Sequence, residues 1–143
     1  MYFQPNSNDG RGFMKYSIQY DDVENFFCIK TIGEFSIEVF QDLVEELFSH
    51  KFWHPGANCL FDYRETDFLK VPIEELQRVS ELHIKSNQIV GQGKSAFVMM
   101  NSSNYGMGRM YQGMTEFSVQ TEFFIFTDFN KAKNWVIVPS TVS

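Results

Sequence analysis

The chain has 143 residues, a length that favours one domain with a single core. Its formal net charge of −6 argues against nucleic acid as the main partner and disfavours anionic membrane surfaces. No apolar run is long enough to span a bilayer and no signal peptide is recognisable, so we expect a cytoplasmic protein without stable membrane insertion.

The two ends of the chain differ in composition from its middle. Residues 1–12 are polar, rich in Gly and Asn and without periodicity, so we expect a disordered lead, with Met14 as a candidate for the native start. We expect one domain over residues 13–138 and a short Ser/Thr-containing tail over residues 139–143.

The first half of the domain predicts two strands, a helix and a third strand. Residues 13–20 and 25–32 alternate in polarity and are joined by a short acidic turn, which indicates an antiparallel pair. Ser36 is expected to cap a helix that ends near His50. Its apolar positions have helical spacing: Val39, Phe40, Leu43, Val44, Leu47 and Phe48. Residues 59–63 form a short apolar run and predict the third strand.

The second half alternates helices with strands. Pro72 suits the first turn of a second helix, which extends to Gly91 and Gly93. Residues 94–100 and 120–126 predict two further strands, with a third helix between them, and Asp128 is expected to cap a fourth. The chain therefore predicts an α/β domain with a single mixed sheet of about five strands and about four helices, in which an N-terminal antiparallel pair precedes parallel strands.

Polar side chains gather where the predicted parallel strands end, which is the edge where α/β proteins usually bind ligands. These candidates are Asp62, Arg64, Asp67, Asn101, Ser103, Asn104 and Arg109. The turn at residues 102–104 could hold an anion at a helix N-terminus. Alternatively, Ser103 or Asn104 only caps the helix and Arg64 only pairs with a neighbouring acid. We favour this second interpretation, because capping alone accounts for these residue types.

The aromatic and methionine content raises a second possibility. The chain has 16 Phe and 7 Met, which either fill the core or line a cavity for a small apolar ligand. Such a cavity is expected between the sheet and the third helix, near Phe97, Met99, Met107, Met110 and Tyr111. Glycine is unfavourable in a helix, and the third helix contains three: Gly106, Gly108 and Gly113. They would allow close approach of the helix to the sheet or to another chain, or they would form a binding surface.

The sequence contains no constellation typical of catalysis, metal binding or cofactor binding. There is no nucleophile elbow, no Cys with a plausible His partner, no P-loop and no dinucleotide fingerprint. The spacing of the three histidines does not suit zinc. Cys28 and Cys59 fit buried free thiols, with a disulfide between them as the alternative. We therefore expect a non-enzymatic protein without cofactor or metal.

Several short motifs resemble the bacterial SpoIIAA-like family, which is related to STAS domains. The resemblance covers roughly residues 14–138 and is carried by the segments Phe52-Trp-His-Pro-Gly56, Leu60-Phe-Asp-Tyr-Arg64 with Asp67-Phe68, Tyr105-Gly-Met-Gly-Arg-Met-Tyr111 and Ala132-Lys-Asn-Trp135. It implies a mixed sheet with helices and a small cytoplasmic module acting through protein contacts, which STAS relatives often switch by serine phosphorylation. Some relatives are also compared with SEC14-type lipid-binding domains.

This chain departs from the phosphorylation pattern of those relatives. The start of its second helix, residues 70–75, has no hydroxyl; Thr66 is expected upstream in a loop and Ser80 at least one turn inside the helix. The sequence thus predicts a protein-interaction or regulatory module without the serine switch, whose partner is another protein or a second copy of the chain. The alternative is a carrier or sensor of a small apolar ligand or lipid. An enzyme acting on an anionic substrate at Ser103 is a third, weaker hypothesis.

Overall fold

The computed structural model describes residues 14–138, so the predicted disordered lead and tail lie outside the described part. The strands are β1 (Met14–Asp21), β2 (Phe26–Glu34), β3 (Asn58–Asp67), β4 (Lys94–Val98) and β5 (Glu122–Phe126). The helices are α1 (Ile37–Phe48), α2 (Ile73–Lys85), α3 (Asn87–Val90), α4 (Ser102–Thr115), the 3-10 turn η2 (Glu116–Ser118) and α5 (Phe129–Ile137).

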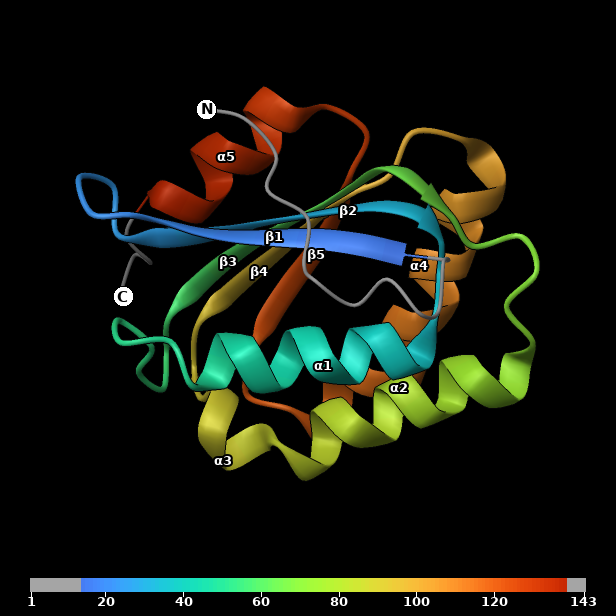
Figure 1. The fold of residues 1–143 in the computed structure, drawn as a ribbon, viewed down its shortest axis with the longest axis horizontal. Coiled ribbons are helices and arrows are strands. Elements are labelled where there is room, and N and C mark those ends of the chain that lie inside the picture. Colours follow the sequence, from blue (N-terminus) through green and yellow to red (C-terminus); the bar gives the residue numbers. More distant parts are fainter. Residues whose placement is uncertain (1–13, 139–143) are drawn as a thin grey trace.

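The strands form one five-stranded sheet in the order β1-β2-β3-β4-β5 (Figure 1). The first pair is antiparallel and the other three pairs are parallel. This confirms the predicted mixed α/β sheet. The short acidic turn after β1 permits the antiparallel pair, whereas each parallel connection passes through at least one helix.

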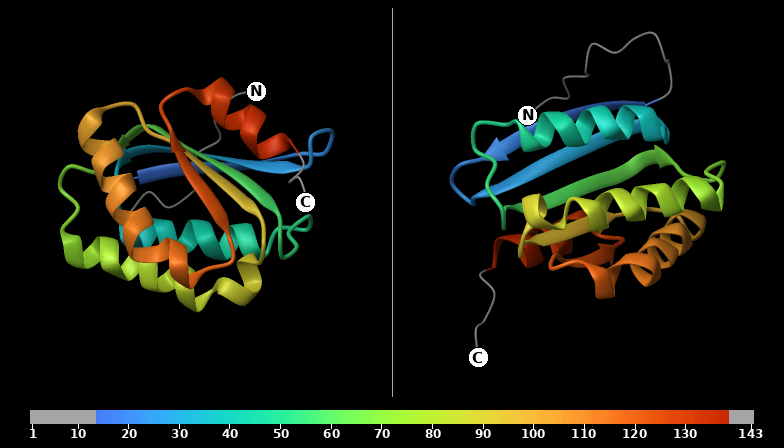
Figure 2. Two further views of the ribbon diagram at one scale, coloured as in Figure 1. Left: turned by 180° about the vertical axis from the view of Figure 1, so that it is seen from behind. Right: turned by 90° about the horizontal axis from the view of Figure 1, so that it is seen from below.

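Helices cover both faces of the sheet (Figure 2). On one face, α1 packs on β1 and β2, and α2 and α4 pack on β3, β4 and β5. On the other face, α5 packs on the central strands through Ala132 and Val136, both fully buried. The face with α1, α2 and α4 holds most of the aromatic core.

Several elements differ in their bounds from the prediction. β3 continues to Asp67 instead of ending near Tyr63, because β2 extends to Glu34 and pairs with it up to that residue. β4 ends at Val98. The predicted second helix is divided at Ser86 into α2 and the short α3, so the domain has one helix more than expected.

The strand register settles the state of the two cysteines. Cys59 pairs with Phe27, and Cys28 pairs with Leu60. Since neighbouring residues on a strand point to opposite faces, the two thiols lie on opposite sides of the sheet. Cys59 packs beneath α1, and Cys28 packs with the α5 cluster. Both are free, which excludes the alternative disulfide between them; Cys59 is a buried thiol as predicted, whereas Cys28 is only half-buried.

Candidate functional site

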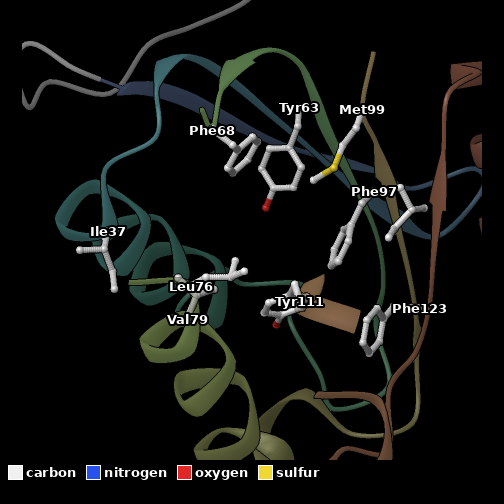
Figure 3. Packing of buried hydrophobic residues seen from close by; sticks show 10 residues of the cluster. Ile37, Tyr63, Phe68, Leu76, Val79, Phe97, Met99, Tyr111 and Phe123 are labelled. Carbon is white, nitrogen blue, oxygen red and sulfur yellow. The ribbon is translucent and has the colours of Figure 1, made fainter. Parts of the chain in front are cut away.

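An apolar cavity of about 110 Å³ lies between the sheet and the helices α1, α2 and α4. Alternate residues of β3 and β4 form its floor: Cys59, Phe61, Tyr63, Ser95 and Phe97. The remaining lining consists of Phe35, Phe40, Val44, Leu47, Phe48, Trp53, Phe68, Val71, Leu76, Val79, Leu82, His83, Ser86, Val90, Met99, Met107, Gly108 and Tyr111. Figure 3 shows part of this cluster, with Leu76 and Val79 on α2 facing Phe97 and Tyr111.

The periodicity of each element explains why these side chains converge. Residues of one strand that are two apart share a face, so Cys59, Phe61 and Tyr63 line one side of β3. On α2, Leu76, Val79 and His83 recur at helical spacing and face the same space. The walls are almost entirely carbon, and rings meet across the cavity at centroid distances of 5.6 Å for Phe61–Phe97 and 5.9 Å for Phe97–Tyr111.

Three hydroxyl groups and one indole N–H at the cavity have no hydrogen-bond partner among the described residues: those of Tyr63, Ser95, the half-buried Ser86 and Trp53. Tyr63 is 7% exposed, and its hydroxyl points into the space between Phe97, Leu76 and Tyr111 (Figure 3). The hydroxyl of Ser95 on β4 likewise has no partner in residues 14–138. The indole Nε1 of Trp53 is buried and unpaired within the same range. Of these atoms only Trp53 Nε1 is fully covered by protein, whereas the hydroxyl oxygens keep accessible surface and can be reached by a bound molecule.

His83 is the one titratable imidazole at the cavity. Its Nε2 lies 3.2 Å from Thr121 Oγ1, which in turn donates to the carbonyl of Gly91. This assigns the imidazole proton to Nε2, so Nδ1 accepts the hydrogen bond of 2.8 Å from the Tyr111 hydroxyl. Burial lowers the pKa of His83 to about 4, because the charged form loses hydration, and the imidazole is neutral at pH 7.

The cavity therefore carries no formal charge at neutral pH. None of its lining residues is Asp, Glu, Lys or Arg. Burial also raises the pKa values of Tyr63 and Tyr111 well above the ordinary range, so both phenols keep their protons. An uncharged apolar environment favours a neutral, mostly apolar ligand over an ion, which would lose its hydration on entry.

Of the five residues predicted for an apolar ligand, four line the cavity: Phe97, Met99, Met107 and Tyr111. The prediction for Met110 was wrong, since this side chain is 43% exposed on the outer side of α4 and is not part of the lining. The sequence did not identify Tyr63, Ser95 or Trp53 as cavity residues. The alternation of the strands could have identified Tyr63 and Ser95, because each is two residues from a phenylalanine on the same face, Phe61 or Phe97. Trp53 lies in a loop, where no periodicity indicates which way a side chain points.

The predicted polar edge does not form a single site. Asp62 and Arg64 lie within β3, not beyond its end, and Asp62 is 3% exposed. Arg64 donates two hydrogen bonds of 2.8 Å to the Asp62 carboxylate, and its guanidinium stacks 4.6 Å from the ring of Phe129 on α5. Burial alone would raise the pKa of Asp62, but Arg64 and then Lys30 hold it below its usual value. The two predicted residues thus pair with each other, as the simpler interpretation expected.

Asn104 has a structural role at the start of α4. It is 2% exposed; its Oδ1 accepts from the Phe68 amide and its Nδ2 donates to the Thr66 carbonyl. The cap of α4 is Asn101, whose Oδ1 accepts a hydrogen bond of 2.8 Å from the amide of Asn104, so the prediction of Ser103 or Asn104 as the cap was wrong. The exposed carboxylate of Asp67 accepts from the Leu69 amide.

The two remaining polar candidates, Ser103 and Arg109, are exposed on the outer side of α4. A second, more open depression lies near the end of β4, and of the predicted polar residues only Asn101 lines it. The predicted residues of the polar edge therefore divide among an ion pair, a helix cap, a buried amide, an exposed helix surface and, for Asp67, the turn after β3.

Comparison with solved structures finds a related fold. An uncharacterised protein of the DUF3478 family from Shewanella loihica PV-4, which has a SpoIIAA-like fold, aligns with a TM-score of 0.59 and 18% sequence identity, over 87% of this chain and 94% of that chain. This confirms the predicted resemblance at the level of the SpoIIAA-like fold. No family model matches the chain, and no curated protein matches it. No helix in residues 14–138 is both long and apolar enough to cross a membrane.

Proposed function

We propose that this domain is a non-enzymatic binding module that holds a small apolar molecule between its sheet and the helices α1, α2 and α4. The observation that carries the proposal is the apolar, uncharged cavity of about 110 Å³. A well-packed domain of this size has few voids larger than a water molecule, and apolar cavities of comparable volume, about 150 Å³, take up benzene.

The volume limits the size of the ligand. Pockets for drug-sized molecules usually measure about 300 to 1,000 Å³, so this cavity suits a single ring or a short alkyl group and not a whole lipid chain. Of the two ligand classes that the sequence suggested, the small apolar molecule is therefore the better supported.

The proposal includes a cytoplasmic location, which the two free thiols support.

The same proposal leaves out a phosphorylation switch of the sporulation type. Among the hydroxyls near the start of α2, Thr66 is 4% exposed and contacts the Thr31 hydroxyl, and Ser80 is 3% exposed and hydrogen-bonds to Thr115 at 2.6 Å. A kinase would need these hydroxyls in solvent, and their burial supports a module without that switch.

Titration with toluene, followed by two-dimensional NMR of the labelled protein, tests the proposal. We expect saturable shifts confined to residues around the cavity. Val79→Phe should abolish them, because the larger ring occupies the space next to a side chain that is only 8% exposed. Val23→Phe is the matched control, since Val23 is 81% exposed in the β1–β2 turn. Absence of saturable shifts in the unmodified protein would rule out the proposal.

Self-association through α4 is a second candidate function. The outer surface of α4, defined by Ser103, Gly106, Arg109, Met110 and Gly113, is exposed, and a Cβ added at either glycine would meet nothing within 4 Å. Glycine is unfavourable in a helix, and these two have no packing reason within the described chain. Their positions would allow the backbone of a second copy to approach closely.

Sedimentation velocity over a range of concentrations tests this second candidate. We expect a dimer that is weakened by Met110→Glu, which introduces a charge at the centre of the surface, and that is unchanged by Val23→Glu at an exposed but distant position. A monomer at every concentration would remove this candidate and leave the cavity proposal unaffected.

A further inference from the structure

We infer that the molecule bound in the cavity is uncharged and carries one hydrogen-bonding group, such as a hydroxyl or carbonyl, which bonds to the Tyr63 hydroxyl while its apolar part lies among the aromatic rings. This inference rests on the proposed function, because it specifies the chemistry of the ligand for the same cavity.

Tyr63 is the one deeply buried tyrosine of the described chain whose hydroxyl has no partner. Tyr16 donates to Glu46 at 3.0 Å, and the Tyr111 hydroxyl bonds to His83 at 2.8 Å. Tyr63 is as deeply buried as these two, with exposed fractions of 7% for Tyr63, 4% for Tyr16 and 9% for Tyr111. A phenylalanine would fill the same space without leaving a polar group unsatisfied. A ligand that bonds to the hydroxyl would explain why this position is a tyrosine.

The geometry directs the Tyr63 hydroxyl at the cavity. Tyr63 shares its face of β3 with Phe61, and its ring contacts Phe68 and Phe97 at centroid distances of 5.1 and 5.9 Å. These neighbours enclose the ring and leave the oxygen directed toward the space next to Leu76 and Tyr111 (Figure 3). A phenolic hydroxyl can donate and accept, so it can recognise a hydroxyl or a carbonyl.

The other unpaired groups lie away from Tyr63, and Ser86 ends α2 ten residues after Leu76. Ser95 pairs in register with Cys59, four residues before Tyr63, which places the two positions about 13 Å apart along the strand. The Trp53 ring packs on Phe27, next to Cys59, and its Nε1 is covered by protein. A single-ring ligand cannot reach both ends. The Tyr63 hydroxyl keeps accessible surface, unlike Trp53 Nε1, and its ring has Phe68 and Phe97 as aromatic neighbours. We therefore assign the polar contact to Tyr63.

The absence of charge from the lining residues excludes ions as good ligands. No carboxylate, ammonium or guanidinium among them would balance a buried charge, and the imidazole of His83 is neutral at pH 7. The expected class is therefore a neutral amphiphile of about one ring, for which phenol is a suitable probe and toluene its isosteric partner without a hydrogen-bonding group.

The test compares the dissociation constants of phenol and toluene, measured by NMR titration at pH 7, for the unmodified protein, Tyr63→Phe and Tyr16→Phe. We expect Tyr63→Phe to weaken phenol binding about 3- to 10-fold, as loss of one neutral hydrogen bond does, with toluene affinity unchanged or slightly raised. Tyr16→Phe, the same chemical change at a hydroxyl outside the cavity, should leave both constants unchanged. Benzoate should not bind.

The outcomes separate this inference from the proposed function. If neither probe binds the unmodified protein, the proposed function fails and the inference fails with it. If both probes bind and Tyr63→Phe leaves the ratio of their dissociation constants unchanged, the cavity binds apolar molecules without a hydrogen bond to Tyr63. Water alone then bonds to this hydroxyl, and the inference is overturned. Benzoate that binds as tightly as phenol would overturn the uncharged class.

Discussion

Asn104 is 2% exposed although it follows a turn of small polar residues. Its amide bridges the start of α4 and the end of β3, because the side chain accepts from Phe68 and donates to Thr66. At the scale of a single residue, a buried amide of this kind fixes how the two elements meet. Burial and pairing, which depend on the fold, decide whether such a residue is structural or available for binding.

Replacing Asn104 should therefore lower stability much more than replacing its neighbour. Asn104→Ala leaves the Phe68 amide and the Thr66 carbonyl without their partner, and we expect the free energy of unfolding to fall by about 2 to 3 kcal/mol. Ser103→Ala at the adjacent exposed position should change it by less than about 0.5 kcal/mol. Urea unfolding of the two variants provides the comparison, and equal effects would contradict the structural role.

His83 predicts a dependence of stability on pH. Its pKa is about 4 in the folded protein and near the ordinary 6.5 when unfolding exposes it. Above pH 6.5 both states are neutral, so His83 adds no dependence there. As the pH falls from 6.5 to 4, the unfolded state binds a proton that the folded state does not, and the free energy of unfolding falls by up to about 3 kcal/mol.

Urea unfolding at pH 7 and pH 4.5 measures this effect in the unmodified protein and in His83→Gln. Carboxylates also titrate in this range, so the informative quantity is the difference between the two proteins. We expect His83→Gln to lose less stability on acidification, and His54→Gln, at an exposed histidine, to follow the unmodified protein. Parallel losses in all three would show that His83 is protonated equally in both states.

The helix α4 shows that packing decides which face of a helix is buried. Its buried stripe is Asn104, Gly108, Tyr111 and Thr115, at successive spacings of four, three and four residues. Gly108 lets the helix approach the sheet, because a Cβ there would lie 2.8 Å from Met99 Sδ and 3.0 Å from Ile125 Cδ1. This confirms close approach to the sheet as the reason for one of the three glycines.

The glycines of α4 should respond to alanine in opposite ways. Gly113→Ala adds a methyl group in open space and should stabilise the protein by about 0.5 to 1 kcal/mol, because alanine favours the helix. Gly108→Ala gains the same helix preference but crowds Met99 and Ile125, so we expect it to be less stable than Gly113→Ala by more than about 1 kcal/mol. Thermal unfolding of both variants gives the comparison; the reverse order would contradict the close approach.

The element order and the pairing directions of the sheet were predictable because hydrophobic periodicity is strong in most segments. Boundaries were less predictable where tertiary pairing overrides composition. β3 continues through the polar residues 64–67 because β2 supplies hydrogen-bonding partners up to Glu34. The buried stripe of α4 was missed for a related reason, since two of its members are polar or glycine and only packing reveals them.

For the molecule as a whole, the aromatic content predicted either a dense core or a cavity, and the structure contains both. The location between sheet and α4 was expected, but α1 and α2 contribute more of the lining than the sequence suggested. Those walls come from segments far apart in the chain, so no local pattern could reveal that they share one space. The same holds for the unpaired Tyr63 hydroxyl, which is unusual only because no partner reaches it.

The order of the strands in the sheet is also their order in the chain. Each strand can therefore join the edge left by the previous one as the polypeptide leaves the ribosome, and the contacts that close the sheet span short stretches of sequence, which favours rapid folding. The floor and two walls of the cavity exist once β4 is in place, whereas Met107 and Tyr111 arrive later with α4. A ligand present during synthesis could thus enter the incomplete cavity before the last third of the chain closes it.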